Sequence, residues 1–151
     1  MPIFTYQFTV PVALERVAGF HRNPLALRKL SPPPVIVQFR QMEPLAEGSI
    51  SEFTMWFGPL PVRWKARHVE VDPLRGFTDI QVSGPFQRWQ HTHRFSRVER
   101  QICRVSEHVA YEHRPGWRGW FTRLLFSQLA LRYMFAYRAW MIRRSLAQEK
   151  S

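Results

Sequence analysis

The sequence predicts an α+β fold in which a curved antiparallel sheet wraps around one long C-terminal helix. Residues 35–111 contain six strand-like stretches in a row, most of them separated by short turns rich in glycine or proline. Residues 118–148 contain no proline and only one glycine, which favours a single long helix. Strands joined by short turns pair as antiparallel hairpins, and a helix has to cover their apolar face.

The N-terminal part adds a seventh strand and two short helices. Residues 4–10 alternate apolar and polar side chains, which is the period of a half-buried strand. Pro11 stands where a helix can begin, and residues 12–20 carry apolar side chains at helical spacing. Residues 23–30, which open with an Asn-Pro pair, predict a second short helix. The Ser-Pro-Pro-Pro run at residues 31–34 then predicts a stiff loop.

The remaining strands follow in order along the chain, and the turns between them are short enough for hairpins. The turn at residues 58–61 reads Gly-Pro-Leu-Pro, and the next, at residues 72–76, runs from aspartate to glycine. The predicted strands are residues 35–42, 49–57, 62–71, 77–83, 88–98 and 101–111.

The C-terminal helix carries two apolar stripes, and only one of them can face the sheet. The first stripe is Phe121, Leu124, Leu131, Phe135, Ala139 and Ile142, and the second is Phe126, Leu129, Tyr133, Tyr137 and Trp140. The second stripe is either buried by other parts of the chain, or a homodimer contact, or an interfacial membrane contact beside Arg123, Arg132, Arg143 and Arg144. A membrane-spanning helix is disfavoured, because Arg132 and Arg138 interrupt the apolar stretch.

Composition is typical of one folded domain over residues 1–151, with 45% hydrophobic and 15% aromatic residues. Cys103 is the only cysteine, so no internal disulfide is available and a reducing compartment fits. The N-terminus shows no signal-peptide pattern, and we expect a cytoplasmic protein. The net charge of +11 comes from arginines scattered along the chain without a basic block. We therefore expect no specific nucleic-acid binding.

Residues 88–95 give the main indication of function. In a strand, successive side chains point to opposite faces, so Trp89, His91, His93 and Phe95 share one face. The opposite face carries two arginines and belongs in water. Two imidazoles therefore point inward among aromatic rings, which is more typical of a cavity wall than of a solid aliphatic core.

Two carboxylates are predicted to meet these histidines inside the sheet. Asp79 and Glu107 lie on the inward faces of the neighbouring strands, and a buried carboxylate needs a partner such as imidazole. Three interpretations stay open. The groups form a structural network that satisfies itself, or they bind the polar end of an apolar ligand, or they form a catalytic or metal site.

Known cofactor and catalytic motifs are absent from the sequence. The His-x-His pair suits a metal, but Gly84 precedes His91 by seven positions and Glu99 follows His93 by six, which misses the cupin pattern. There is no glycine-rich phosphate loop, no G-x-S-x-G elbow, no H-E-x-x-H and no C-x-x-C. We predict no metal and no cofactor.

These features together resemble the helix-grip fold of the SRPBCC superfamily, which includes START lipid-transfer domains, birch-pollen allergen (Bet v 1) relatives and bacterial polyketide cyclases. The resemblance covers essentially the whole chain. Its most specific pattern is Phe77-x-Asp79-x-Gln81-x-x-Gly84-Pro85-Phe86-x-x-Trp89-x-His91-x-His93-x-Phe95, followed by Glu107-x-x-x-Tyr111 and Phe135-x-Tyr137-Arg138. The last pattern is similar to that of a bacterial subgroup described as polyketide cyclase-like or associated with cell-division inhibitors. Glu107 departs slightly from the family pattern, because aspartate is common at this position in the relatives.

The resemblance implies an apolar cavity between sheet and helix that binds a small hydrophobic molecule such as a lipid or polyketide. The alternatives are a polyketide cyclase-like enzyme that uses an inward His–carboxylate pair for acid–base chemistry, and a module that associates with membranes or proteins. The expected wall residues are Trp64, Phe77, Trp89, Phe95, Tyr111, Leu124, Leu131 and Phe135. The expected polar residues are Asp79, His91, His93 and Glu107, with Arg138 reaching an anionic headgroup.

Overall fold

A computed structural model describes residues 2–23 and 25–148 of the chain. The predicted start of the second helix includes Pro24, which lies outside the described residues. The elements are β1 (Ile3–Val10), α1 (Leu14–Arg22), α2 (Ala26–Leu30), β2 (Ile36–Met42), β3 (Ile50–Phe57), β4 (Leu60–Asp72), β5 (Gly76–Ser83), β6 (Arg88–Glu99), β7 (Ile102–Glu112), a 3-10 turn (Gly116–Gly119), α3 (Trp120–Leu125) and α4 (Gln128–Gln148).

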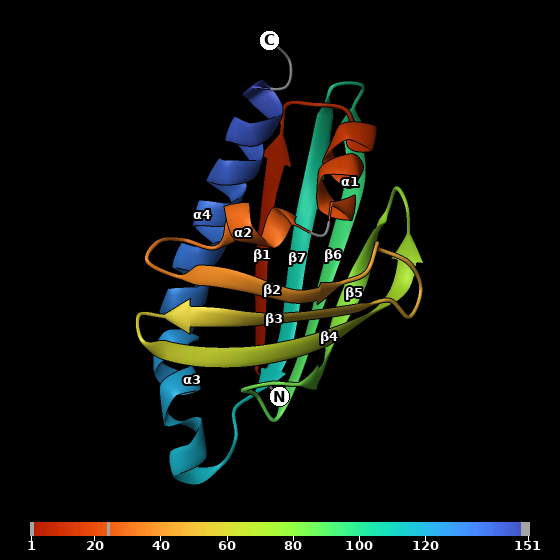
Figure 1. Cartoon of the computed structure of the whole chain (residues 1–151). Coiled ribbons are helices and arrows are strands. Elements are labelled where there is room, and N and C mark those ends of the chain that lie inside the picture. The colour runs from red at the N-terminus through yellow and green to blue at the C-terminus, as the bar shows by residue number, and fades with distance from the viewer. Residues whose placement is uncertain (1, 24, 149–151) are drawn as a thin grey trace.

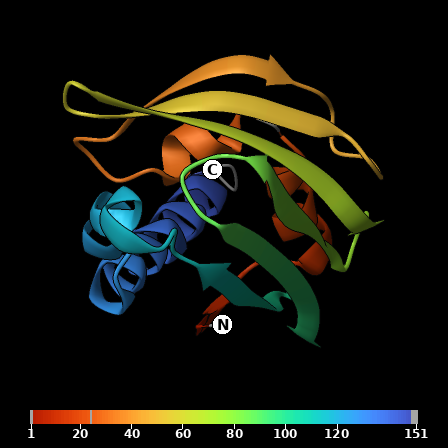
Figure 2. The same cartoon turned by 90° about the horizontal axis from the view of Figure 1, so that it is seen from below.

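The strands form one seven-stranded antiparallel sheet in the order β1-β7-β6-β5-β4-β3-β2. Strands β2 to β4 cross the long strands β1, β7 and β6 at a steep angle, so the sheet is strongly curved (Figure 1). Seen from below, α4 runs between the two arms of this curve (Figure 2). The predicted α+β fold, a curved sheet around a C-terminal helix with two short helices after the first strand, is confirmed.

The register of β5, β6 and β7 decides which polar side chains meet. Asp79 pairs with His91 across β5 and β6, and His93 pairs with Glu107 across β6 and β7. Residues directly opposite each other in an antiparallel sheet point to the same face. All four side chains therefore lie on the concave face, toward α4.

One stripe of α4 fills the middle of the molecule. Leu131, Phe135, Ala139, Ile142 and Leu146 are all buried. Their spacing of three or four residues places them on a single helical face. These residues are the first predicted stripe without Phe121 and Leu124 and with Leu146 added, and they anchor α4 against the sheet.

The prediction of one unbroken helix over residues 118–148 is wrong. The chain leaves helical geometry at Phe126, and Ser127 precedes α4. The Ser127 Oγ accepts a hydrogen bond from the Ala130 N–H at 3.2 Å. A serine that bonds the third amide of a helix is an N-cap, and it competes with continuation of the preceding helix. The break turns the Phe126 ring inward, where it is buried.

The break also separates the members of the two predicted stripes. Leu124, expected at the cavity wall, lies on the outer side of α3 and is 67% exposed. In the second stripe, Phe126 is buried but Leu129, Tyr133 and Trp140 are exposed. The interpretation that the chain itself buries the whole second stripe is therefore wrong. Within the described part of the chain, the length and apolar character needed to cross a bilayer are found in none of the helices.

Candidate functional site

A cavity of about 150 Å³ lies between the concave face of the sheet, the α1–α2 region and α4. An engineered protein cavity of about this size holds one benzene molecule, so the space suits a single aromatic ring. Several lining residues are partly exposed. The most exposed, Arg22 and Asn23, belong to the α1–α2 connection and face the half-buried β2–β3 connection, so we place the opening of the cavity between these two connections. Its wall is mostly rings and thioethers: Phe53, Trp64, Phe77, Trp89, Phe126 and Phe135, with Met42, Met55 and Met134.

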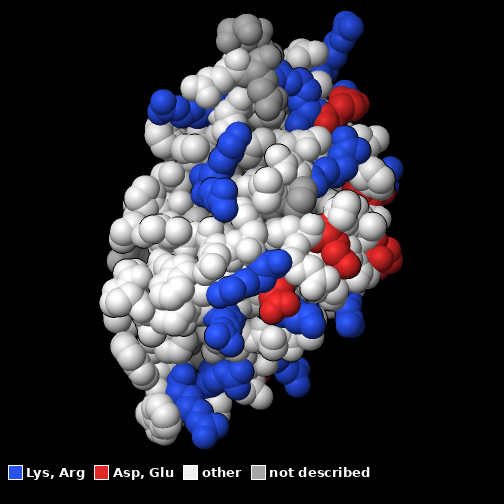
Figure 3. All heavy atoms as spheres, in the orientation of Figure 1, with Lys and Arg blue, Asp and Glu red and all other residues white. Residues whose placement is uncertain are grey.

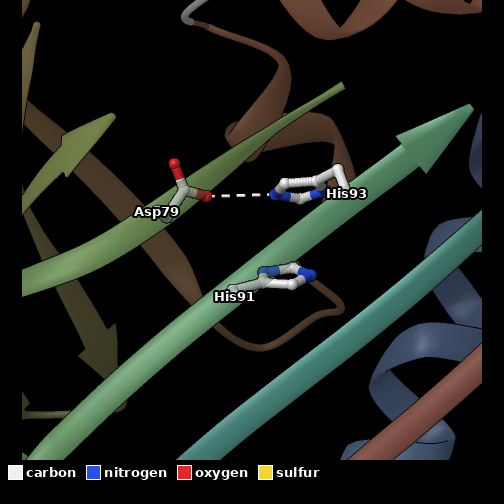
Figure 4. A group of neighbouring side chains, drawn as sticks. All are labelled: Asp79, His91 and His93. Atoms are coloured by element: carbon white, nitrogen blue, oxygen red, sulfur yellow. Dashed lines mark hydrogen bonds and ion pairs between the residues drawn. The ribbon is translucent and has the colours of Figure 1, made fainter. Parts of the chain in front are cut away.

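A chain of alternating histidines and carboxylates, here named the His–carboxylate chain, runs across four strands beside this cavity. His91 Nε2 lies 2.7 Å from Glu107 Oε2, and His93 Nδ1 lies 3.0 Å from the same oxygen. His93 Nε2 lies 3.0 Å from Asp79 Oδ2, and His68 Nε2 lies 3.0 Å from Asp79 Oδ1. The members are therefore His68, Asp79, His93, Glu107 and His91, in that order. His91 and His93 lie side by side, with Asp79 across from His93 (Figure 4).

The His–carboxylate chain contains both hydrogen bonds and ion pairs. The His91–Glu107 and His93–Asp79 contacts have hydrogen-bond geometry. The 3.0 Å contacts of His93 Nδ1 with Glu107 and of His68 with Asp79 are ion-pair distances without hydrogen-bond alignment. At its outer end, His68 Nδ1 lies 2.9 Å from the Ser49 Oγ, which fixes the orientation of this ring.

The two carboxylates and His93 are charged at neutral pH. Burial alone would raise the pKa of Glu107, but the positive charge of His93 and the contacts with His91 hold it well below its ordinary value. Burial likewise opposes ionisation of Asp79, and its contacts with His68 and His93 outweigh this and lower its pKa. Burial disfavours the His93 imidazolium, but Glu107 and Asp79 raise the pKa of His93 to about 9.

Two other buried histidines are neutral. Burial, with the positive charge of His93 next, lowers the pKa of His91 to about 4, and the same two causes lower the pKa of His21 to about 4. The ionised Glu107 can only accept, so neutral His91 donates from Nε2 and keeps its lone pair on Nδ1. His91 therefore offers a hydrogen-bond acceptor, or a weak base, at the cavity wall.

Three potential ligand atoms at this site lie close enough together to share a metal ion. One ligand atom each from Asp79, His91 and His93 lies within 4.8 Å of the other two. In the structure, the His93 imidazolium already supplies the positive charge between Asp79 and Glu107. A divalent cation that bound here would first have to displace the extra proton of the His93 imidazolium. The prediction that the protein uses no metal stays a prediction.

The structure brings most of the predicted site residues to the cavity. Those that line it are Trp64, Phe77, Asp79, Trp89, His91, His93, Phe135 and Arg138. Glu107 lies behind the two histidines of β6 and reaches the cavity only through them.

Four predicted wall residues do not line the cavity. Phe95 is buried against the ring of His21, with 4.6 Å between ring centroids. The Tyr111 hydroxyl accepts a hydrogen bond from Gln128 at 2.8 Å, so this side chain supports the start of α4. Leu131 is fully buried in the core, and Leu124 points outward from α3.

Sequence reasoning missed several cavity residues, although some carried a signal. His21 continues the helical spacing of the buried residues Leu14, Val17 and Ala18, which predicts an inward ring. Phe53 and Met55 alternate on β3 in the way that a cavity-facing strand should. Phe126 carried no such signal, because its inward position depends on the helix break.

Comparison with known proteins gives structural neighbours only. No family model matches the chain, and no curated protein matches it. The Zhui aromatase/cyclase from a Streptomyces species has 12% identity, with 95% of each chain covered and a TM-score of 0.70. Norcoclaurine synthase from Thalictrum flavum has 17% identity, with 99% of this chain and 88% of that chain covered and a TM-score of 0.68. A START superfamily protein from Mycobacterium smegmatis has 8% identity over 97% of both chains and a TM-score of 0.69.

These likenesses extend over nearly the full length of each chain, so they concern the whole architecture. They agree with the sheet order, the two short helices after the first strand and the terminal helix between the arms of the sheet. The chain therefore has the helix-grip fold of the SRPBCC superfamily, with the START and Bet v 1-like arrangement. Fold alone does not assign an activity, which has to be argued from the site.

Proposed function

We propose that the protein binds a compact hydrophobic molecule that carries one polar, hydrogen-bonding group. The observation that supports this is a ring-lined cavity that ends at a buried His–carboxylate chain. Apolar walls favour burial of a hydrophobic body, and the lone pair of His91 is a partner for a hydroxyl group. Few convergent polar groups in an apolar pocket are typical of sites that orient a small ligand.

The size of the cavity narrows the range of ligands. A volume of about 150 Å³ suits one ring and is too small for an intact lipid or a multi-ring polyketide. Norcoclaurine synthase, which has a similar fold, was solved in complex with dopamine and hydroxybenzaldehyde, both of which are single-ring molecules. We therefore favour a small aromatic compound, and a longer molecule would extend through the opening beside α2.

Fluorescence can test the proposal directly, because Trp64 and Trp89 both line the cavity. Titration with 4-methylphenol should give a saturable change in tryptophan emission, and native mass spectrometry should detect a co-purifying small molecule. Filling the cavity with Ala66→Leu should lower the affinity for 4-methylphenol at least tenfold. Ala136→Leu, at an exposed position of α4, is the matched control. A wild-type protein that shows no saturable response to single-ring phenols up to millimolar concentration contradicts the proposal.

An acid–base enzyme is the second candidate, and one observation favours it. The rings of neutral His91 and protonated His93 lie side by side, with centroids 3.9 Å apart, so a base at the cavity wall has a positive charge beside it that can stabilise an enolate. Such a pair suits proton transfer at an enolisable ketone, as in a cyclase-like reaction.

The variant His91→Gln separates binding from catalysis. If the site only binds, the affinity for 4-methylphenol should stay within about tenfold. If the site is catalytic, exchange of the methyl protons of acetophenone with deuterium oxide, followed by NMR, should be faster with the protein. That rate should then fall about a hundredfold in the variant. Absence of any exchange above buffer removes this second candidate.

The exposed face of α3 and α4 supports a peripheral membrane contact as an additional role. Residues 116–148 contain six arginines and no aspartate or glutamate. In Figure 3 the acidic side chains lie toward the right and centre, whereas the left edge, where α3 and α4 run in Figure 1, shows only uncharged and basic residues. Aromatic rings beside arginines suit the interface of an anionic bilayer. Within residues 116–148, the large exposed apolar side chains are Trp117, Trp120, Leu124, Leu129, Tyr133 and Trp140.

Flotation with vesicles tests this contact. The protein should float with phosphatidylglycerol–phosphatidylcholine vesicles at low salt and less so at high salt, since exposed charges are screened. The double variant Trp120→Ser, Leu124→Ser should float less, whereas Ile80→Ser on the exposed face of β5 should behave as wild type. Absence of flotation together with a dimer by light scattering, dissociated by the same double variant, would assign this face to a homodimer.

A further inference from the structure

We propose that Arg138 is an anion subsite of the cavity, and that the natural ligand is a compact hydrophobic carboxylate. This inference rests on the proposed function and specifies its ligand class. The carboxylate would pair with the guanidinium on α4, while the apolar body occupies the ring-lined space. Three observations support it: the position of Arg138, the lack of a hydrogen-bond or ion-pair partner for it among the described residues, and the contacts that Asp79, Glu107 and Glu43 make with other groups.

Arg138 is a cavity residue without a polar partner. It follows Phe135 by one turn of α4, its guanidinium lies 5.1 Å from the centroid of that ring, and it lines the cavity. Among residues 2–23 and 25–148, no hydrogen bond or ion pair of its guanidinium is found, and its Nε is enclosed without an acceptor. Arg138 as a whole is half-buried, but its enclosed Nε–H has no acceptor, and such a donor is costly unless a ligand supplies one.

Three described carboxylates at or beside the cavity each contact other groups. Asp79 is held by His93 and His68, and Glu107 is held by His91 and His93. Glu43, at the opening of the cavity, accepts a hydrogen bond from the Ile50 N–H at 2.6 Å. The acceptors that could have satisfied the guanidinium therefore point elsewhere, and the space beside it remains for a bound molecule.

A carboxylate satisfies this guanidinium better than a neutral group does. The planar fork of arginine matches the two oxygens of a carboxylate, whereas a ketone or a phenol offers a single oxygen. The net charge of +11, with Arg22 at the opening, draws anions toward the cavity. The cavity size limits the rest of the ligand to about one ring.

The test compares two probes of the same size that differ in charge. Benzoate and benzyl alcohol are titrated into wild-type protein and into the variants Arg138→Gln and Arg138→Lys, with calorimetry and tryptophan fluorescence as readouts. Wild-type protein should bind benzoate at least tenfold more tightly than benzyl alcohol. Arg138→Gln should lose at least tenfold in benzoate affinity and keep its affinity for benzyl alcohol. Arg138→Lys should be intermediate, because it keeps the charge and loses the fork.

Controls separate this inference from the proposed function. Arg132→Gln removes an exposed arginine of the same helix and should leave both affinities unchanged. Equal wild-type affinity for the two probes, or unchanged benzoate affinity in Arg138→Gln, refutes the carboxylate subsite but leaves the proposed function standing. Failure of both probes to bind wild-type protein contradicts the proposed function as well. The wild-type comparison needs no variant, so it decides the question even if Arg138→Gln does not fold.

Discussion

Two halves of the interior are filled by different kinds of side chain. The half under α1 and the C-terminal end of α4, here the aliphatic half, contains Val10, Val17 and Ile142, each at most 1% exposed. The half around the first turns of α4, here the aromatic half, contains rings such as Trp64 and Phe86 and supplies most of the cavity wall. The cavity is bordered mainly by the rings of the aromatic half, whereas the branched side chains of the aliphatic half pack against one another.

The His–carboxylate chain lies where the two halves meet. His93 stacks on Phe77 of the aliphatic half, with 4.4 Å between centroids. His91 meets the edge of Phe135 of the aromatic half, with 5.2 Å between centroids. Polar groups placed at this boundary are supported by packed residues on one side and face open space on the other. A ligand site needs this combination, because positioned polar groups require a rigid support.

The largest effect should come from removing a carboxylate at this boundary. Glu107→Gln leaves the His93 imidazolium with one carboxylate instead of two, in a buried site. Breaking a buried ion pair typically lowers the free energy of unfolding by about 3–5 kcal/mol. Urea unfolding followed by circular dichroism measures the change.

The matched control is Glu112→Gln, at the exposed end of the same strand. Its ion pair with Arg88 spans 4.0 Å at the surface, so the expected cost is below about 0.5 kcal/mol. Equal costs for the two variants would show that the boundary does not depend on its charges.

The second prediction concerns the pH dependence of stability. The loss of stability at alkaline pH (the alkaline limb) and the loss at acidic pH (the acid limb) have different causes. The pKa of His93 is raised to about 9, so its contribution is complete below about pH 6.5 and is lost as the pH rises toward 9. The pKa values of His91 and His21 are lowered to about 4, so these two residues remove stability as the pH falls from about 6.5, and the carboxylates add to this loss below about pH 4.5. Stability should therefore be highest near pH 6–7.

Thermal melts between pH 4 and 9.5 measure both limbs. The alkaline limb should amount to about 3 kcal/mol, and His93→Gln should remove it. The same variant should reduce the acid limb, because the positive charge of His93 helps to lower the pKa values of His91, His21 and Glu107. A wild-type melting temperature that is constant between pH 6.5 and 9 contradicts the charged state assigned to His93.

The third prediction compares the packing of the two halves. Ile142→Ala empties space in the dense aliphatic half and should cost about 2–4 kcal/mol. Met134→Ala, at the cavity wall, loses contacts on one side only and should cost about 1 kcal/mol. The same change enlarges the cavity, so it should strengthen binding of a two-ring phenol relative to 4-methylphenol. Similar unfolding costs for the two variants would mean that the halves do not differ in packing.

The fold could be predicted because its signals are local. Alternation along each strand and turn residues between strands indicated all seven strands, and pairing of sequential hairpins then brought Asp79, His91, His93 and Glu107 together. Features that depend on tertiary packing could not be predicted. The placement of His21 beside His93 depends on how α1 docks, and the unsatisfied state of Arg138 depends on where every nearby carboxylate points.

The break between α3 and α4 depends partly on a local sequence signal and partly on tertiary packing. It gives the smallest predicted change in the free energy of unfolding. Residues 120–128 contain no glycine or proline, so only the Ser127 hydroxyl marks the start of α4, through its bond to the Ala130 N–H. Loss of such a cap typically costs about 1 kcal/mol. Ser127→Ala should therefore lower the free energy of unfolding by that amount, as measured in urea, while Ser145→Ala near the end of α4 should have no effect.

The same variant tests how the aromatic half keeps its open space. Without the cap, α3 and α4 compete to form one continuous helix, which would draw the Phe126 ring out of the cavity wall. Hydrogen exchange should then show faster opening of residues 126–130 than in wild type, together with weaker binding of 4-methylphenol. Unchanged exchange at these amides would show that burial of Phe126, and not the serine cap, holds the break in place.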